Sequence, residues 1–112
     1  VDGDRHAGWV ACVWGTHGEE IVGEAGWNVV DEAQGSAELG LSVLDHWRGS
    51  GVANRLMGAL MTGARSSGLR HIYGDVLDAN ARMLAFMRRH GLEEGWDDPP
   101  EPGIVRVSCK LR

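Results

Sequence analysis

The stretch LDHWRGSGVANRLM, residues 44–57, lies between a run typical of a β-strand and a run typical of an α-helix. Gly49 and Gly51 carry no side chain, so the backbone N–H groups of this stretch can approach a ligand closely. A helix that begins directly after the glycines adds the positive end of its dipole. We therefore expect this junction to suit a phosphate group.

The residues on both sides of the junction predict a mixed α/β fold. AELGLSVL, residues 37–44, alternates apolar and polar residues, as a strand with one buried face does. Apolar residues recur at helical spacing from Val52 to about Ser66, and LRHIYGDVL, residues 69–77, has β character again. A strand, a helix and a strand in this order require a parallel pair with a crossover.

The two ends of the chain add antiparallel elements. The runs Gly8–Gly15 and Ile21–Val30 are separated by a short glycine-containing turn and predict a hairpin. Asp78 is the expected N-cap of a second helix that runs to His90, and Gly91 is expected to end it. IVRVSCKL, residues 104–111, alternates as a closing strand.

Length and charge narrow the class of protein. A chain of 112 residues with a net charge of −5 is expected to be a single domain whose main partner is neither nucleic acid nor an anionic membrane surface. No signal peptide or membrane-length apolar run is present, which predicts a cytoplasmic protein. Cys12 and Cys109 lie in apolar runs and are expected to be buried and reduced, with a disulfide as the alternative.

Three interpretations of the glycine junction come from the residues themselves. A Walker phosphate loop needs a lysine and a hydroxyl residue after the last glycine, where Val52 and Ala53 stand. A dinucleotide fingerprint needs a third glycine where Asn54 stands. A glycine-rich turn without any ligand is the third interpretation.

A fourth interpretation uses more of the chain. The pattern Arg48-x-x-Gly51-x-Ala53 resembles the pyrophosphate loop of the GNAT superfamily of acyl-CoA-dependent N-acetyltransferases. LDANARMLAFMRRHGL, residues 77–92, resembles the family's Asn-to-Gly-Phe helix, with Asn80 and Gly91 at the matching spacing and Leu92 in place of Phe. DRHAGWVA, IVGEAGW and AELGLSVLDHWRGSG follow one another as in bacterial Pat-type protein lysine acetyltransferases. The resemblance implies one GNAT domain over residues 1–112 that lacks the family's opening strand and helix pair.

The resemblance implies acetyl-CoA as the cosubstrate. The backbone of residues 41–43 would pair with the pantetheine arm, and successive amides from residues 49–54 would donate to the pyrophosphate. Arg82, Arg88 and Arg89 are expected to form one cationic edge of the second helix, which is solvated or supplies one contact to the 3′-phosphate. The implied cofactor-binding residues are Leu41, Ser42, Val43, Arg48, Gly49, Ser50, Gly51, Val52, Ala53, Asn54 and Asn80.

Acetyl transfer to an amine requires a base, because an alkylammonium with a pKa of about 10.4 is protonated at neutral pH. The resemblance implies that Glu38 is this base, and Asp75 matches a second position where relatives carry an acid. The amide of Ser42 or Val43 would stabilise the oxyanion. Many relatives protonate the departing thiolate with a tyrosine where Met87 stands, and a thioether cannot donate a proton.

The predicted function is therefore an N-acetyltransferase that transfers an acetyl group from acetyl-CoA to a primary amine, on a protein lysine or a small molecule, by direct attack in a ternary complex. The alternatives are a non-catalytic CoA-sensing or partner-binding module and a nicotinamide-binding domain. The five histidines show no metal-ligand spacing with the cysteines, so no metal site is expected. Unpaired strand edges would allow a homodimer.

Overall fold

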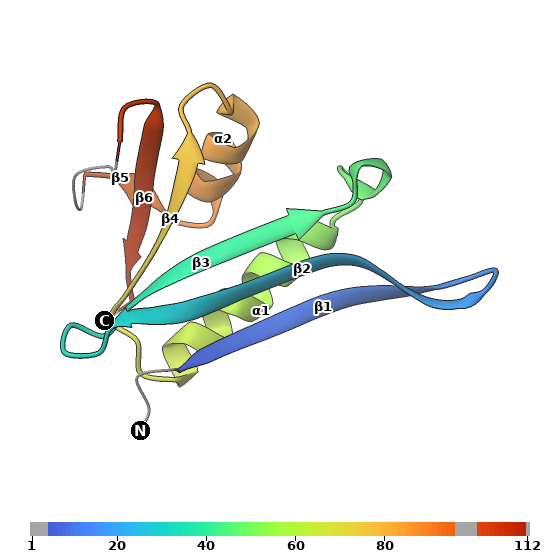
Figure 1. Ribbon diagram of the computed structural model, residues 1–112, viewed down its shortest axis with the longest axis horizontal. Helices are drawn as coiled ribbons and strands as arrows, with labels where there is room; N and C mark the ends of the chain where they lie inside the picture. The colour runs from blue at the N-terminus through green and yellow to red at the C-terminus, as the bar shows by residue number, and fades with distance from the viewer. Residues whose placement is uncertain (1–4, 96–100, 112) are drawn as a thin grey trace.

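The computed structural model describes residues 5–95 and 101–111 and contains one six-stranded mixed sheet with two helices (Figure 1). The strand order is β1-β2-β3-β4-β6-β5, and β3 and β4 are the parallel pair. The mixed α/β fold expected from the sequence is confirmed. The elements are β1 (His6–Gly15), β2 (Gly18–Asp31), β3 (Ser36–Val43), a 3-10 turn (Asp45–Trp47), α1 (Val52–Ser66), β4 (His71–Leu77), α2 (Ala81–Arg89), β5 (Glu93–Glu94) and β6 (Ile104–Lys110).

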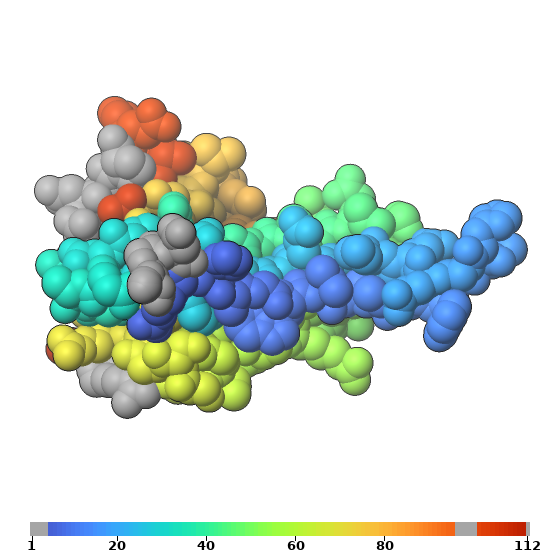
Figure 2. Space-filling view, turned by 60° about the horizontal axis from the view of Figure 1, so that its bottom comes forward, coloured from blue at the N-terminus to red at the C-terminus, as the bar shows by residue number. Residues whose placement is uncertain are grey.

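The predicted hairpin is confirmed and is longer than the apolar runs suggested. Gly15 pairs with Gly18 across a tight turn, and Gly18 has a φ of +109°, which favours glycine. The register shifts between Ala11 and Cys12, which marks a β-bulge. In Figure 2 the end of this hairpin extends past the rest of the molecule.

Both helices pack on one face of the sheet. The inward-facing side chains of β2, β3 and β4 meet the apolar stripe of α1, and Gly63 of α1 leaves room for the Trp9 ring, which a Cβ there would approach to 2.5 Å. Phe86 and Met87 of α2 belong to the same core. The largest fully buried side chains include Met57, Leu60, Leu69, Ile72, Leu92, Val22 and Val107. Because side chains alternate along a strand, every second residue of β1–β4 points to the face of the sheet away from the helices.

We call this opposite face the outer face. Val10, Cys12 and Trp14 alternate along β1 and are exposed on it, with Trp14 84% exposed. The prediction of buried thiols is therefore wrong for Cys12, because period-2 alternation places it on the side of the strand away from α1. Cys109 is half-buried, and both thiols are free.

The strands β3 and β4 separate after a short parallel ladder. Only three pairs form, Ser36 with His71, Ala37 with Ile72 and Glu38 with Tyr73, although β3 continues to Val43. Figure 1 shows the two strands leaving a common point and diverging. Leu39 lies where they part, and a Cβ on Gly74 would come within 3.3 Å of its Cδ1 atom. The second half of β3 is consequently paired with β2 on one edge and open on the other.

The start of α2 differs from the prediction. Asn80, not Asp78, is the N-cap, because its Oδ1 accepts a hydrogen bond from the Met83 N–H at 3.1 Å. Asp78 is held in the preceding turn, where its N–H donates to the Gly103 carbonyl at 2.9 Å. The predicted helix stop is confirmed: Gly91 has a φ of +89°, and the Leu92 N–H closes the turn on the Met87 carbonyl at 2.9 Å.

Candidate active site

A cleft of about 600 Å³ opens between the free edge of β3, the loop before α1 and the facing side of α2. It is the space that the divergence of β3 and β4 leaves on the helical side of the sheet. The residues that line it are Leu41, Ser42, Val43, Trp47, Arg48, Gly49, Ser50, Gly51, Ala53, Asn54, Asn80, Arg82, Met83, Phe86 and Arg89. Of the eleven residues expected to bind a cofactor, the cleft brings together all but Val52, which lies at the first position of α1.

The loop before α1 presents backbone donors to this cleft. Gly49 and Gly51 have φ values of +78° and +94°, and nothing lies within 4 Å of a Cβ built on either residue. Gly51 is the N-cap and offers no side chain to the first turn. Within the described part of the chain, the N–H groups of Gly49, Gly51, Ala53 and Asn54 donate no hydrogen bond. Free donors at the positive end of a 15-residue helix suit an anion.

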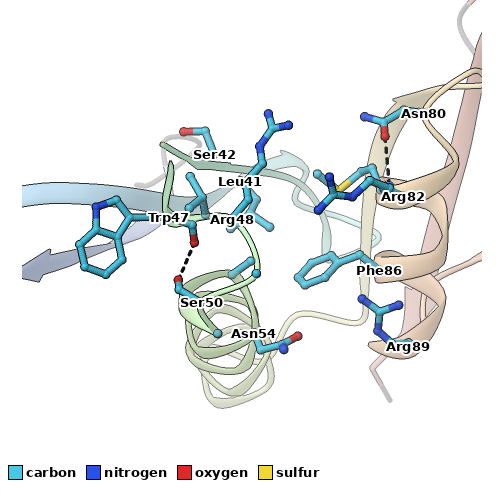
Figure 3. A pocket seen from close by; sticks show the side chains of 15 residues that line it. Leu41, Ser42, Trp47, Arg48, Ser50, Asn54, Asn80, Arg82, Phe86 and Arg89 are labelled. Atoms are coloured by element: carbon cyan, nitrogen blue, oxygen red, sulfur yellow. Dashed lines mark hydrogen bonds between the residues drawn. The ribbon is translucent and has the colours of Figure 1, made fainter. Parts of the chain in front are cut away.

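The wall formed by α2 adds positive charge. Arg82 and Arg89 are seven residues apart on α2 and extend with Phe86 toward the loop and first turn of α1 (Figure 3). Arg88 does not line the cleft, so the predicted cationic edge of three arginines splits into two that face the cleft and one that does not. The lining residues that the structure describes include three arginines and no Asp or Glu, in a chain of net charge −5. The cleft is thus a local cationic site.

Arg48, the third arginine of the cleft, belongs to the loop. Its guanidinium lies 3.1 Å from a carboxylate oxygen of Asp45 in an ion pair whose side chains are 59% and 90% exposed. Such an exposed pair contributes about 1 kcal/mol or less. Breaking this ion pair therefore costs little free energy, so the guanidinium of Arg48 can contact an anionic ligand instead.

A hydrogen bond joins the two helices at the base of the cleft. The Nε2 atom of His90 lies 3.0 Å from Oδ1 of Asn54, and because this oxygen only accepts, Nε2 is the donor. Burial and the neighbouring positive charge of Arg89 lower the pKa of His90. No local signal in the sequence links His90 with Asn54, which lies 36 positions away.

Asn80 has two roles in this geometry. Its Oδ1 caps α2, and the residue also lines the cleft. The side-chain amide group is not used by the cap and carries two N–H donors. The cofactor contact expected for Asn80 stays a prediction alongside its structural role.

The two candidate bases lie on the outer face in different surroundings. Glu38 is exposed and is the register partner of Asn28 on β2 and of Tyr73 on β4. Asp75 accepts two hydrogen bonds from Arg106 of β6, at 2.8 and 3.0 Å. The Arg106 guanidinium also stacks on the Tyr73 ring at 4.4 Å from its centroid. Arg106, which sequence reasoning missed, therefore makes Asp75 part of a cross-strand ion pair.

A second hollow of about 400 Å³ lies on the outer face over β1, β2 and β3. Leu41 and Ser42 line both this hollow and the cleft on the helical side. The second half of β3 thus forms a wall one strand thick between two concave surfaces. One surface is cationic, and the other is lined by the carboxylate of Glu24 with no Lys or Arg among its described residues.

Met87 is 3% exposed and packs in the hydrophobic core, so it offers no proton donor to the cleft. Among residues 5–95 and 101–111, no group of three or more His, Cys, Asp or Glu side chains is arranged to hold a metal ion. No helix in these ranges is long and apolar enough to cross a membrane.

The family model of the acetyltransferase (GNAT) family matches residues 2–92. The chain belongs to this family, and both the mixed sheet with its parallel pair and the two helices match the GNAT fold. The match includes β1 to β4, both helices and the whole cleft.

Solved structures extend the comparison to nearly the whole chain. The GNAT domain of S. lividans PAT superimposes with a TM-score of 0.82 over 98% of this chain, at 24% identity. A GNAT-family acetyltransferase from Staphylococcus aureus Mu50 gives a TM-score of 0.77 over 96% of this chain, at 19% identity. A ribosomal-protein-alanine N-acetyltransferase from Brucella melitensis gives 0.69 over 81%, at 23% identity. The chain spans only 63% of the S. lividans domain and 62% of the Brucella protein.

Proposed function

We propose that the protein is an N-acetyltransferase that transfers an acetyl group from acetyl-CoA to a primary amine within a ternary complex. The observation that carries the proposal is the open half of β3, which separates a cationic cleft from a hollow on the outer face. An anionic thioester on one side and an amine on the other would meet at this edge. Family membership supports acyl transfer as the chemistry.

The cofactor would occupy the cleft. The free N–H groups between Gly49 and Asn54 would bind the diphosphate, because successive amides at a helix N-terminus hold a dianion without a large basic surface. The pantetheine arm carries amide groups of its own, and these would hydrogen-bond to the unpaired edge of Leu41, Ser42 and Val43 as an added strand. Arg48 and the arginines of α2 would neutralise the remaining phosphate charge.

Glu38 would act as the base. It is exposed next to the point where β3 and β4 separate, whereas the carboxylate of Asp75 is occupied by Arg106. The carboxylate takes a proton from the ammonium group, directly or through water, and the neutral nitrogen then attacks the thioester carbonyl. A C–N bond forms while an amide N–H of Ser42 or Val43 stabilises the oxyanion, the nitrogen releases its second proton to water, and the C–S bond breaks. Water protonates the departing thiolate, since Met87 cannot.

Calorimetric titration of acetyl-CoA combined with a thiol-release assay tests the proposal. The native chain is expected to bind acetyl-CoA and to release CoA only when an amine is present. Glu38→Gln is expected to bind with unchanged affinity and to lose turnover by about 100-fold or more. Glu93→Gln on β5 removes a carboxylate far from the edge and serves as the matched control. Unchanged turnover in Glu38→Gln would remove Glu38 from the mechanism.

A non-catalytic CoA-binding module is the second candidate, and the core position of Met87 favours it, because the cleft then lacks the family's usual proton donor. The same pair of measurements separates the two candidates. A module of this kind binds acetyl-CoA and releases no thiol with any amine. A nicotinamide-binding domain has no support from the family match and predicts affinity for NADH instead of CoA.

A further inference from the structure

Three glycines lie in one row across the outer face. Gly8 of β1 is the register partner of Gly26 on β2, and Gly26 is the partner of Gly40 on β3. The row runs perpendicular to the strands, from the open edge of β3 to the edge strand β1. With strands about 4.8 Å apart, it forms a floor of bare backbone about 10 Å long. This floor lies within the 400 Å³ hollow. We call the floor formed by Gly8, Gly26 and Gly40 the glycine trough.

The rims of the glycine trough carry polar side chains on exposed positions. Glu24 and Ser42 are register partners on one side of the row, and Asn28 and Glu38 are register partners on the other. Each side of the glycine row therefore carries one carboxylate, and all four residues are exposed. Glu24, Asn28 and Ser42 line the hollow, and Glu38 stands next to Asn28 just beyond its lining. Arg48, Arg82 and Arg89 line the cleft on the opposite side of the sheet, whereas no arginine is among the described residues that line the hollow. The trough is thus complementary to a cationic molecule.

The two carboxylates lie at different distances from the open edge of β3. Glu38 is on β3, at the last pair before β3 and β4 diverge, so it lies near the end where a thioester would arrive. Glu24 is one strand further from that end, on the opposite rim. A molecule that places one cation at Glu38 would extend over Gly40 and Gly26 and bring a second cation within reach of Glu24. The apolar chain between the cations would lie on the glycine floor.

We propose, on the basis of the function proposed above, that the acceptor is a small, unbranched aliphatic amine with two cationic nitrogens. The nitrogen at Glu38 loses its proton and is acetylated, and the nitrogen at Glu24 stays protonated and sets specificity. A hollow of 400 Å³ lies within the range that holds small molecules, which favours a free diamine over a peptide segment. A floor without side chains lets the methylene chain of such an amine lie directly against the backbone.

The first test compares 1,4-diaminobutane with 1-aminobutane, which has the same chain length and one cation fewer. We expect the native chain to show a KM about five-fold lower for the diamine, the effect of one solvent-exposed ion pair. Glu24→Gln is expected to abolish this ratio through KM with little change in kcat for the diamine. Glu93→Gln is the charge-matched control and should keep the ratio. Equal KM values in the native chain, or an unchanged ratio in Glu24→Gln, would overturn the assignment.

The second test fills the trough. A Cβ on Gly40 meets nothing within 4 Å, so Gly40→Val is expected to fold and to raise the KM for the diamine. Gly58 of α1 has equally open surroundings, and Gly58→Val is the matched control on the helix. Circular dichroism verifies that both variants are folded. A diamine KM that is the same in Gly40→Val and Gly58→Val would overturn the assignment.

Calorimetric titration of 1,4-diaminobutane into the CoA-loaded chain separates this inference from the function on which it rests. Binding that weakens in Glu24→Gln, without acetylation of either amine, supports the trough and refutes the transferase. Acetylation of both amines with equal KM supports the transferase and refutes the trough. A lysine-containing peptide that is acetylated with a lower KM than the diamine would also refute the assignment of a small acceptor.

Discussion

Glu38 of β3 and Tyr73 of β4 form the last register pair before the two strands separate. The carboxylate of Glu38 therefore lies at the apex of the opening, on the face opposite the helices. The unpaired edge of β3 begins directly beyond it and forms one wall of the cationic cleft. A single strand thus brings a candidate base and a candidate cofactor surface together.

Asp75→Asn is expected to lower stability more than it lowers acetyl transfer. The carboxylate accepts two hydrogen bonds from Arg106, in a pair whose side chains are only 15% and 22% exposed for Arg106 and Asp75. Removing one charge from this partly buried pair should cost about 2 kcal/mol. Urea unfolding measures the loss, and Glu38→Gln, which breaks no ion pair among the residues that the structure describes, is the comparison. A loss of turnover in folded Asp75→Asn as deep as that in Glu38→Gln would contradict the assignment of Glu38 as the sole base.

Arg82→Gln and Arg89→Gln are each expected to weaken CoA binding about two- to five-fold, with a smaller effect at high salt. Both residues line the cleft. Arg88→Gln changes the neighbouring position of the same helix outside the cleft and is the matched control. Calorimetry at two salt concentrations measures the difference, and equal losses in all three variants would mean that only net charge matters.

Substitutions of Asn80 separate its cap from its place in the cleft. Asn80→Ala should lower stability by about 1 kcal/mol, because the Met83 N–H loses its acceptor. Asn80→Asp keeps an acceptor at the cap and should retain stability, while it removes the amide donors and adds a negative charge to the cleft. We expect acetyl-CoA to bind Asn80→Asp more weakly than Asn80→Ala. Native affinity in Asn80→Asp would limit Asn80 to the cap.

The depressed pKa of His90 predicts a pH dependence of stability. Burial and Arg89 disfavour the protonated ring in the folded chain, so the unfolded chain takes up the proton first as pH falls. The contribution of neutral His90 is therefore complete above its ordinary pKa of about 6.5 and is lost as pH falls through the lower folded value. Urea unfolding at several pH values between 7.5 and 5 should show a steeper decline for the native chain than for His90→Gln. His17→Gln, in the exposed turn of the hairpin, is the control.

Local patterns predicted most elements of the fold. The predicted helix from Val52 to about Ser66 agrees with α1, because glycines precede it and Ser-Ser-Gly ends it. The prediction of Asp78 as the cap of α2 was wrong, since Asp and Asn cap equally well and the backbone of Asp78 is bonded to the distant Gly103 in the turn before the helix. Cys12 was misplaced because its run is apolar on both sides of the strand.

The candidate site could be predicted in part. The glycine junction identified the loop, and the seven-residue spacing of Arg82 and Arg89 was a signal that they share a helix face. The ion pair of Asp75 with Arg106 depends on the register between β4 and β6, which no local pattern sets. The bond from Asn54 to His90 likewise joins two helices whose approach follows from packing.

Leu41 and Ser42 separate the two concave surfaces, and this position limits which mutations can change one surface without changing the other. Each of these residues borders both concave surfaces, so a mutation there would change the shape of both at once. A change in specificity would have to arise at residues that line only one of the two surfaces, such as Glu24 in the hollow or Arg82 in the cleft.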